Sequence, residues 1–221
     1  MEIDLKKLIV PAIGFIILIV LVVLVVRTPI GPKETGTPTP TASNPNVANI
    51  LKIRDNDWIL GTREAKVELI VYSNLTCPAC AYFHPIIEEM VKNLNGKLVV
   101  AFRHFPFHQN ADLAAYAAES AGIQGKFWEM TDVLFENSDT WAAEQDPINT
   151  FSSYAKTLGL DVTKFKTDYI SSSVRNVITE SMNDVSDLGI NATPTFFING
   201  EKVINYPNDL DEFTAMIEEE L

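Results

Sequence analysis

The sequence predicts an α/β fold that carries an inserted block of helices and is preceded by one transmembrane helix. Three observations support this prediction. A run of apolar residues without charge lies near the N-terminus, at residues 8–26. Two strand patterns then flank one helix pattern, which is the arrangement of a parallel strand–helix–strand unit. Several further helix patterns separate this unit from two short strands and a closing helix.

The apolar run Leu8–Val26 predicts a helix that crosses a bilayer, because about 20 apolar residues span the hydrocarbon core. A cleaved signal peptide is the alternative. Its apolar region is ordinarily about 7–15 residues long and is followed by small residues, whereas this run is longer and is followed by an arginine. We therefore expect an uncleaved anchor in the cell membrane. Lys6 and Lys7 precede the run, and this excess of positive charge predicts that residues 1–7 are cytoplasmic and that the later chain is extracytoplasmic.

Residues 27–46 are predicted to form an extended linker, because five prolines and two glycines leave little to bury. A globular domain is expected at residues 47–221. The whole chain has a net charge of −12, which argues against nucleic acid as a partner. The sequence shows no coiled-coil repeat, so we expect a monomer that contacts the lipid bilayer through its N-terminal helix.

Within residues 47–221 the patterns follow one another in a defined order. The expected elements are an edge strand at Trp58–Gly61, a central strand at Lys66–Ser73, a helix from Cys77 to about Leu94 that is broken or bent at Pro85, and a strong strand at Lys97–Phe105. Helix patterns follow at Ala111–Ala121, Gly125–Asn137, Pro147–Leu158, Val162–Ser171 and Val174–Leu188. The chain then continues with strands at Thr195–Ile198 and Glu201–Asn205 around an Asn199-Gly200 turn, and with a helix from Asp209. This is the order of a thioredoxin-like fold with a helical insertion at about residues 110–190.

The two cysteines of the chain, Cys77 and Cys80, lie three positions apart at the start of the helix that follows the central strand. The first turn of a helix presents free N–H groups and the positive end of the macrodipole, which stabilise a thiolate and lower its pKa. Cys77 is therefore the candidate nucleophile. Cys80, one turn further along, is placed to attack a mixed disulfide formed by Cys77 and to release the substrate.

Two structural interpretations of the cysteine pair are weaker. Tetrahedral zinc needs four ligands, and only His84, His104 and His108 could complete the set. A purely structural disulfide would close a four-residue loop and would constrain the unfolded chain little. The sequence thus favours a redox site without a metal. His84 is expected on the helix surface near the active face, and His104 is expected to pack or to form a hydrogen bond at the end of its strand.

Four segments resemble the DsbA-like thiol-disulfide oxidoreductases, especially their membrane-anchored bacterial branch. They are Cys77–Cys80 after a strand, Phe102–Pro106, Gln124–Trp128 together with Leu134–Asn137, and Ala192–Gly200. The resemblance covers roughly residues 57–221. It implies a thioredoxin fold with a helical insertion, no bound cofactor, and disulfide exchange on exported proteins.

By this resemblance, Pro194 is a cis-proline that faces the cysteines, and the Thr193 backbone pairs with a bound substrate chain. Pro78 and Ala79, between the cysteines, belong to the same substrate-binding surface. An ordinary trans proline at the start of a strand is the alternative interpretation of Pro194.

The chain departs from the family pattern at Val71. Relatives commonly carry a buried Glu or Asp six residues before the first cysteine, where it helps to move the proton of the resolving thiol, and Val71 occupies that position here. Glu68 cannot replace it, because an odd separation along a strand points a side chain to the other face. Proton transfer at Cys80 is then expected to rely on water or on another group.

These observations predict an anchored oxidoreductase that passes the Cys77–Cys80 disulfide to exported protein thiols. A separate membrane thiol oxidase would regenerate the disulfide. A reductase or isomerase supplied by an electron donor remains an alternative, although an isomerase usually needs a dimer. A tethered binding module or chaperone without turnover is a further alternative from a different class.

Overall fold

The computed structural model describes residues 45–221, with side chains from residue 47 onward. The predicted membrane helix at Leu8–Val26 and residues 27–44 of the predicted linker lie outside the described residues. Among the helices that are described, none is both long enough and apolar enough to cross a membrane. Helix α2 (Pro45–Ile50) opens the described part, so the predicted linker ends in a helix rather than in extended chain.

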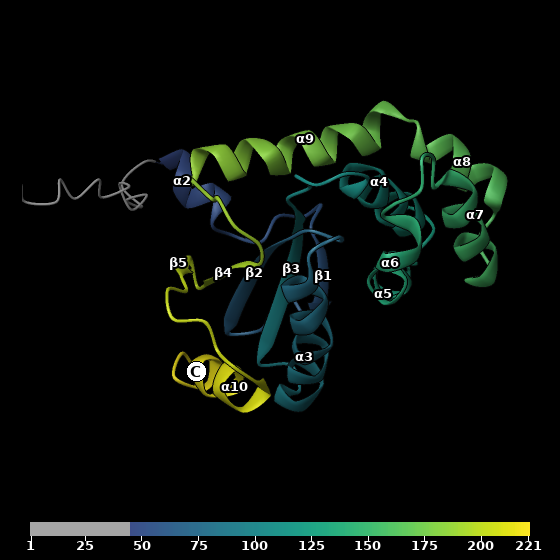
Figure 1. Cartoon of the computed structure of the whole chain (residues 1–221). Coiled ribbons are helices and arrows are strands. Elements are labelled where there is room, and N and C mark those ends of the chain that lie inside the picture. Colours follow the sequence, from purple (N-terminus) through teal and green to yellow (C-terminus); the bar gives the residue numbers. More distant parts are fainter. Residues whose placement is uncertain (1–44) are drawn as a thin grey trace, which may run out of the picture. The chain divides into compact units, whose positions relative to one another are not determined.

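In the described part of the chain, five strands form one mixed sheet in the order β1-β3-β2-β4-β5 (Figure 1). The strands are β1 (Trp58–Gly61), β2 (Val67–Ser73), β3 (Leu98–His104), β4 (Thr195–Ile198) and β5 (Glu201–Lys202). β2 and β3 are parallel, as predicted, and the other neighbouring strands are antiparallel. β2 is thus the central strand, and its carboxyl end points to the cysteines.

The sequences of β2 and β3 explain their central position. They read VELIVYS and LVVAFRH, which are nearly continuous apolar runs rich in β-branched residues. Strands that are covered on both faces need such runs instead of strict alternation. Every residue of β3 is buried accordingly. β5 is shorter than predicted and ends at Lys202, although the Val203 N–H still donates to the Phe196 carbonyl of β4 at 3.0 Å.

Helices α3 (Pro78–Leu94) and α10 (Leu210–Glu218) pack against one face of the sheet (Figure 1). Phe83 on α3 contacts Phe196 of β4 edge to face, with ring centroids 5.2 Å apart. α3 continues through Pro85, so the break that the sequence suggests does not occur. It ends where Asn95 adopts a left-handed conformation with φ of 43°.

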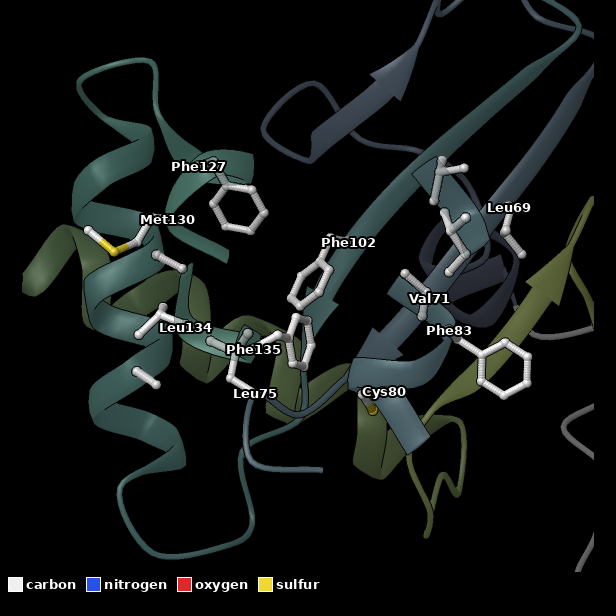
Figure 2. Packing of buried hydrophobic residues seen from close by; sticks show 14 of the residues in the cluster. Leu69, Val71, Leu75, Cys80, Phe83, Phe102, Phe127, Met130, Leu134 and Phe135 are labelled. Carbon is white, nitrogen blue, oxygen red and sulfur yellow. The ribbon is translucent and has the colours of Figure 1, made fainter. Parts of the chain in front are cut away.

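The helical insertion lies between β3 and β4 and shares the core of the sheet. It consists of α4 (Ala111–Gly122), α5 (Phe127–Glu136), α6 (Ser138–Trp141), α7 (Ile148–Thr157), α8 (Val162–Tyr169) and α9 (Ser172–Asp187). Figure 2 shows Phe127, Met130 and Leu134 of the insertion in one cluster with Phe102 of β3. The insertion is therefore continuous with the sheet core and does not have a core of its own.

The opposite face of the sheet is covered by α2 and by the end of α9, with Tyr72 and Phe197 in the contact. The Arg103 guanidinium lies buried on this face. It donates to Asp57 Oδ2 at 2.8 Å and to Tyr72 Oη at 3.0 Å. It also donates to the carbonyl of Ile50, the last residue of α2, and to the carbonyl of Lys52 at 2.7 Å. These bonds fix the N-terminal segment of the domain to the sheet.

Candidate active site

A tight turn after β2 sets the position of both cysteines. Asn74 follows the strand, and its carbonyl accepts the N–H of Cys77 at 2.9 Å. The Asn74 side-chain oxygen accepts the N–H of Thr76 at 3.0 Å, which is the geometry of an Asx turn. Pro78 then occupies the first helical position, where its missing N–H costs nothing. Cys77 is therefore the N-cap residue of α3.

The Cys77 thiol is half-buried at this helix terminus. The hydrogen bond from the Cys80 side chain lowers the pKa of Cys77, and the Thr193 hydroxyl and the N–H groups of Cys80 and Ala79 act in the same direction. Together they outweigh partial burial and bring the pKa to about 5. Cys77 is thus a thiolate at neutral pH, which is the reactive form for disulfide exchange.

Cys80 differs from Cys77 both in its burial and in the direction of its pKa shift. It is 2% exposed, and the Asn74 N–H donates to its Sγ at 3.4 Å. Burial raises the pKa of Cys80, with the neighbouring Cys77 adding to the effect, so Cys80 stays protonated at neutral pH. The two sulfurs are not joined in a disulfide in this structure. The arrangement gives one half-buried thiol at the helix terminus and one buried thiol a turn later. The roles of Cys77 as nucleophile and of Cys80 as resolving thiol stay predictions.

The loop before β4 faces the cysteines. The Thr193–Pro194 peptide bond is cis, which the family resemblance predicts. The Cys77 thiol donates to the Thr193 carbonyl at 3.4 Å, and the Tyr206 hydroxyl donates to the Pro194 carbonyl at 2.7 Å. The Thr193 hydroxyl is buried and has no hydrogen-bond partner among the described residues, so it is available to donate to the Cys77 thiolate, whose pKa it lowers.

The predicted substrate-binding residues lie around Cys77. Pro78 and Ala79 are exposed at the start of α3, while Thr193 and Pro194 come from the opposing loop. The structure brings them together, and their role in binding stays a prediction. The sequence did not indicate Tyr82 and Tyr206, which are exposed aromatic residues anchored by hydrogen bonds to backbone carbonyls. Exposed aromatic rings leave no periodic signal in a helix or loop pattern.

The sequence suggests that His84 lies on the surface of its helix. The structure shows instead that His84 is buried, with 8% of its surface exposed. Its Nε2 lies 2.6 Å from Asp132 Oδ1 of α5, and its ring stacks on Trp128 at 6.1 Å between centroids. The insertion therefore covers a side chain that α3 alone would leave in solvent. His104 forms the hydrogen bond predicted for it, with Nε2 3.0 Å from Glu119 Oε1.

Val71 and Glu68 lie as the strand period predicts. Val71 is buried and lines a small cavity beneath Cys80, whereas Glu68 accepts the Ile53 N–H at 3.4 Å on another part of the sheet. None of the described residues that line this cavity is a carboxylate. In the described part of the chain, the lining of this cavity thus holds no group in the place of the carboxylate that the family resemblance leads one to expect.

One cluster among the described residues has the composition of a metal site. Ligand atoms of His84, Glu88 and Asp132 lie within 4.8 Å of one another. The His84 Nε2 is already hydrogen-bonded to Asp132, and exposed acidic groups of this kind are common without a metal. We therefore do not assign a metal to this cluster.

A thiolate at the start of a helix, a buried thiol one turn later and a facing cis-proline together define a dithiol redox protein of the thioredoxin fold. A family model described as thioredoxin matches residues 54–219, and the chain belongs to this family.

Solved structures extend this assignment. α-DsbA1 of Wolbachia pipientis is 26% identical with a TM-score of 0.67, and the match covers 77% of this chain and 94% of that one. BdbD of Bacillus subtilis is 22% identical with a TM-score of 0.65, covering 74% and 92%. MdbA of Corynebacterium diphtheriae, a thiol-disulfide oxidoreductase, is 18% identical with a TM-score of 0.60, covering 75% and 89%. The predicted resemblance to DsbA-like proteins is confirmed.

Curated relatives match in sequence over part of their length. The Na+/H+ antiporter NhaA 1 of Mycolicibacterium vanbaalenii is 35% identical over 153 residues, which are 66% of this chain and 24% of that protein. The antiporter NhaA 3 of Salinispora tropica is 35% identical over 152 residues, which are 67% and 22%. The chain thus spans about a quarter of these relatives, and transport describes those longer proteins.

The pKa of Cys77 predicts a defined pH dependence of stability. Its folded pKa lies below the unfolded value of about 8.5, so ionisation stabilises the folded reduced protein. This stabilisation is fully present above about pH 8.5 and is lost as the pH falls through about 5. Urea unfolding of both redox forms at a series of pH values should show that the reduced protein gains stability relative to the oxidised one as the pH rises from about 5 to about 8.5. An advantage that grows on acidification would contradict the assignment.

Thr193→Val should raise the pKa of Cys77, because the thiolate loses a hydroxyl donor. A hydrogen bond to a charged group contributes about 1.5–3 kcal/mol, which corresponds to a rise of about one to two pH units. Thiolate absorbance of the reduced protein measures the shift. Thr195→Val is the matched control, since the Thr195 hydroxyl donates to the Ala192 carbonyl at 2.8 Å. Equal shifts in both variants would show that the Thr193 hydroxyl does not act on Cys77.

Proposed function

We propose that this chain is a membrane-anchored thiol-disulfide oxidoreductase that passes the Cys77–Cys80 disulfide to thiols of exported proteins. The observation that carries this proposal is the asymmetry of the two cysteines. Cys77 is partly exposed with a pKa of about 5, and Cys80 is 2% exposed. A structural disulfide does not require such a difference, whereas an exchange reaction does.

The direction of exchange follows from the stability of the thiolate. A Cys77 thiolate that is stabilised by its surroundings favours the reduced protein, and the disulfide is then readily given away. This supports oxidation of the substrate over reduction. It also makes Cys77 a good leaving group in the step that releases the product.

The reaction proceeds in two exchanges. A substrate thiolate attacks Cys77 Sγ, the new substrate–Cys77 bond forms, and Cys80 leaves with its electron pair and takes up a proton. A second substrate thiolate then attacks the substrate sulfur of the mixed disulfide, and Cys77 leaves as a thiolate. The substrate loses two electrons, and the dithiol gains them. A membrane thiol oxidase that accepts these two electrons would restore the disulfide.

Substrate chains are proposed to bind across the surface formed by Pro78, Ala79 and the Thr193–Pro194 loop. The Thr193 carbonyl already lies 3.4 Å from Cys77 Sγ, so an extended chain paired with this loop would bring its cysteine to Cys77. The exposed aromatic side chains of Tyr82 and Tyr206 offer apolar contact without selecting one sequence. This favours a broad range of unfolded substrates.

Two other functions remain distinct from this proposal. A reductase would use the same residues in the reverse direction and would need electrons delivered to the disulfide. A tethered binding module would use the surface around Cys77 without turnover. The low pKa of Cys77 favours the oxidase over the reductase because a stabilised thiolate favours the reduced protein. It favours the oxidase over the binding module because a low thiol pKa has a consequence only when bonds are exchanged.

The equilibrium reduction potential tests the direction. Against glutathione buffers we expect a value closer to about −120 mV, typical of a strong oxidant, than to about −270 mV, typical of thioredoxin. Cys77→Ser should abolish exchange, and Cys80→Ser should accumulate a mixed disulfide with a dithiol peptide. A potential near that of thioredoxin would support the reductase. Absence of reversible exchange, with peptide binding retained, would support the binding module.

The anchor and location are part of the proposal and rest on the apolar run Leu8–Val26 and the preceding Lys6 and Lys7. We expect the expressed chain to stay in the membrane pellet after alkaline extraction and to keep its full length. A protease added outside intact cells or spheroplasts should degrade the domain. Release of a shortened soluble form would instead identify residues 8–26 as part of a cleaved signal peptide.

A further inference from the structure

A small cavity lies directly beneath the buried thiol. Cys80, Ser73, His84, Val71 and Pro194 are among the residues that line it. Its volume of about 10 Å³ is close to what a single water molecule requires. Ser73 and His84 supply polar groups in an otherwise apolar lining, so a proton that leaves Cys80 has few groups to which it can pass.

His84 also borders a second hollow, which opens to solvent. This hollow has a volume of about 280 Å³ and is lined by Asp132, Glu88 and Glu136, among others. Among the described residues that line the two spaces, His84 is the one common to both. Its imidazole therefore separates the interior cavity at Cys80 from an acidic surface.

The sequence spacing produces this position. His84 follows Cys80 by four residues on α3, so both side chains lie on the same helix face. The ring is held from the insertion by Trp128, by Phe135 at 4.9 Å between centroids, and by Asp132 Oδ1, 2.6 Å from Nε2. With Nε2 bonded to the carboxylate, Nδ1 is the nitrogen that can accept a further proton.

His84 has carboxylates on its solvent side and the Cys80 thiol on its interior side, and a negative charge beside the imidazole stabilises the protonated ring. Asp132 and Glu136 of α5 and Glu88 of α3 line the same hollow as the ring. Of these, Asp132 bonds to Nε2, and Glu88 has a carboxylate oxygen within 4.8 Å of the His84 and Asp132 ligand atoms. The titratable group on the interior side is the Cys80 thiol. A carboxylate bonded to an imidazole orients the ring and stabilises its positive charge. The partly exposed Asp132 also connects the ring to solvent, which can remove or return the proton.

We propose that His84, positioned by Asp132, relays the proton of Cys80 and performs the task of the carboxylate that Val71 replaces. This inference rests on the proposed function. When Cys80 attacks the mixed disulfide at Cys77, its proton passes to His84 through one water in the shared cavity, the Cys80–Cys77 bond forms, and the partner sulfur leaves as a thiolate. In the reverse exchange Cys80 leaves as a thiolate and receives the proton from His84.

Oxidation of the reduced full chain by glutathione disulfide isolates this step. The Cys77 thiolate first attacks glutathione disulfide, forms a Cys77–glutathione bond and releases one glutathione thiolate. Cys80 then gives up its proton, attacks Cys77 Sγ and releases the second glutathione thiolate. Acid quenching followed by mass spectrometry separates the reduced chain, the glutathione adduct and the closed disulfide at each time point.

His84→Gln keeps a hydrogen bond to Asp132 but cannot carry the proton. We expect the adduct to form within about twofold of the original rate, and ring closure to slow about tenfold or more at pH 7, which is modest for general acid–base catalysis. The defect should shrink as the pH rises, because hydroxide then removes the Cys80 proton. Asp132→Asn should slow ring closure in the same way but less.

His104→Gln is the matched control, because His104 is also buried and bonded to a carboxylate, Glu119, but does not line the cavity. Ring closure that is unchanged in His84→Gln, or slowed equally in His104→Gln, would overturn the relay. If His84→Gln does not fold, as judged by circular dichroism, the Asp132→Asn rate decides, because Asp132 is partly exposed.

Two further outcomes distinguish failure of the proton relay from failure of the proposed oxidoreductase function and from metal binding at His84. A chain with the natural sequence that forms no adduct and no disulfide would contradict the proposed function itself, before the relay is tested. Ring closure that depends on a divalent cation and is abolished by a chelator would overturn the relay, because a metal bound by His84, Glu88 and Asp132 would occupy the imidazole. Insensitivity to the chelator supports the relay.

Discussion

The site depends on the short turn that joins β2 to α3. Asn74 holds this turn through its carbonyl and its side chain, and its N–H also contacts Cys80 Sγ at 3.4 Å. One residue thus fixes the backbone before Cys77 and the environment of Cys80. Because the turn places one sulfur at the helix terminus and the next inside the core, two chemically identical side chains acquire opposite acid–base properties.

Much of this fold could be predicted from the sequence, because its strongest elements carry local signals. The apolar runs of β2 and β3, the cysteine spacing before an amphipathic helix and the Asn199-Gly200 turn each specify structure over a few residues. Two short helices, α2 and α6, were missed. They span only six and four residues, too few for a 3.6-residue period to be recognised.

The surroundings of the cysteines were less predictable, because they come from distant parts of the chain. The burial of His84 depends on α5, and the contact of Thr193 with Cys77 joins residues more than a hundred positions apart. A single sequence shows that His84 shares a helix face with Cys80, but it does not show what covers that face. The prediction of a surface histidine failed for this reason.

The shared core of the insertion and the sheet has a consequence for redesign. Phe127 and Met130 pack into the same cluster as the residues beneath Cys80, and Asp132 on the same helix contacts α3 through His84. The insertion is therefore not a separable module that could be exchanged between scaffolds while the dithiol chemistry is kept. Transplanting the four-residue cysteine motif alone into a minimal host would transfer the nucleophile without the interior that surrounds its partner.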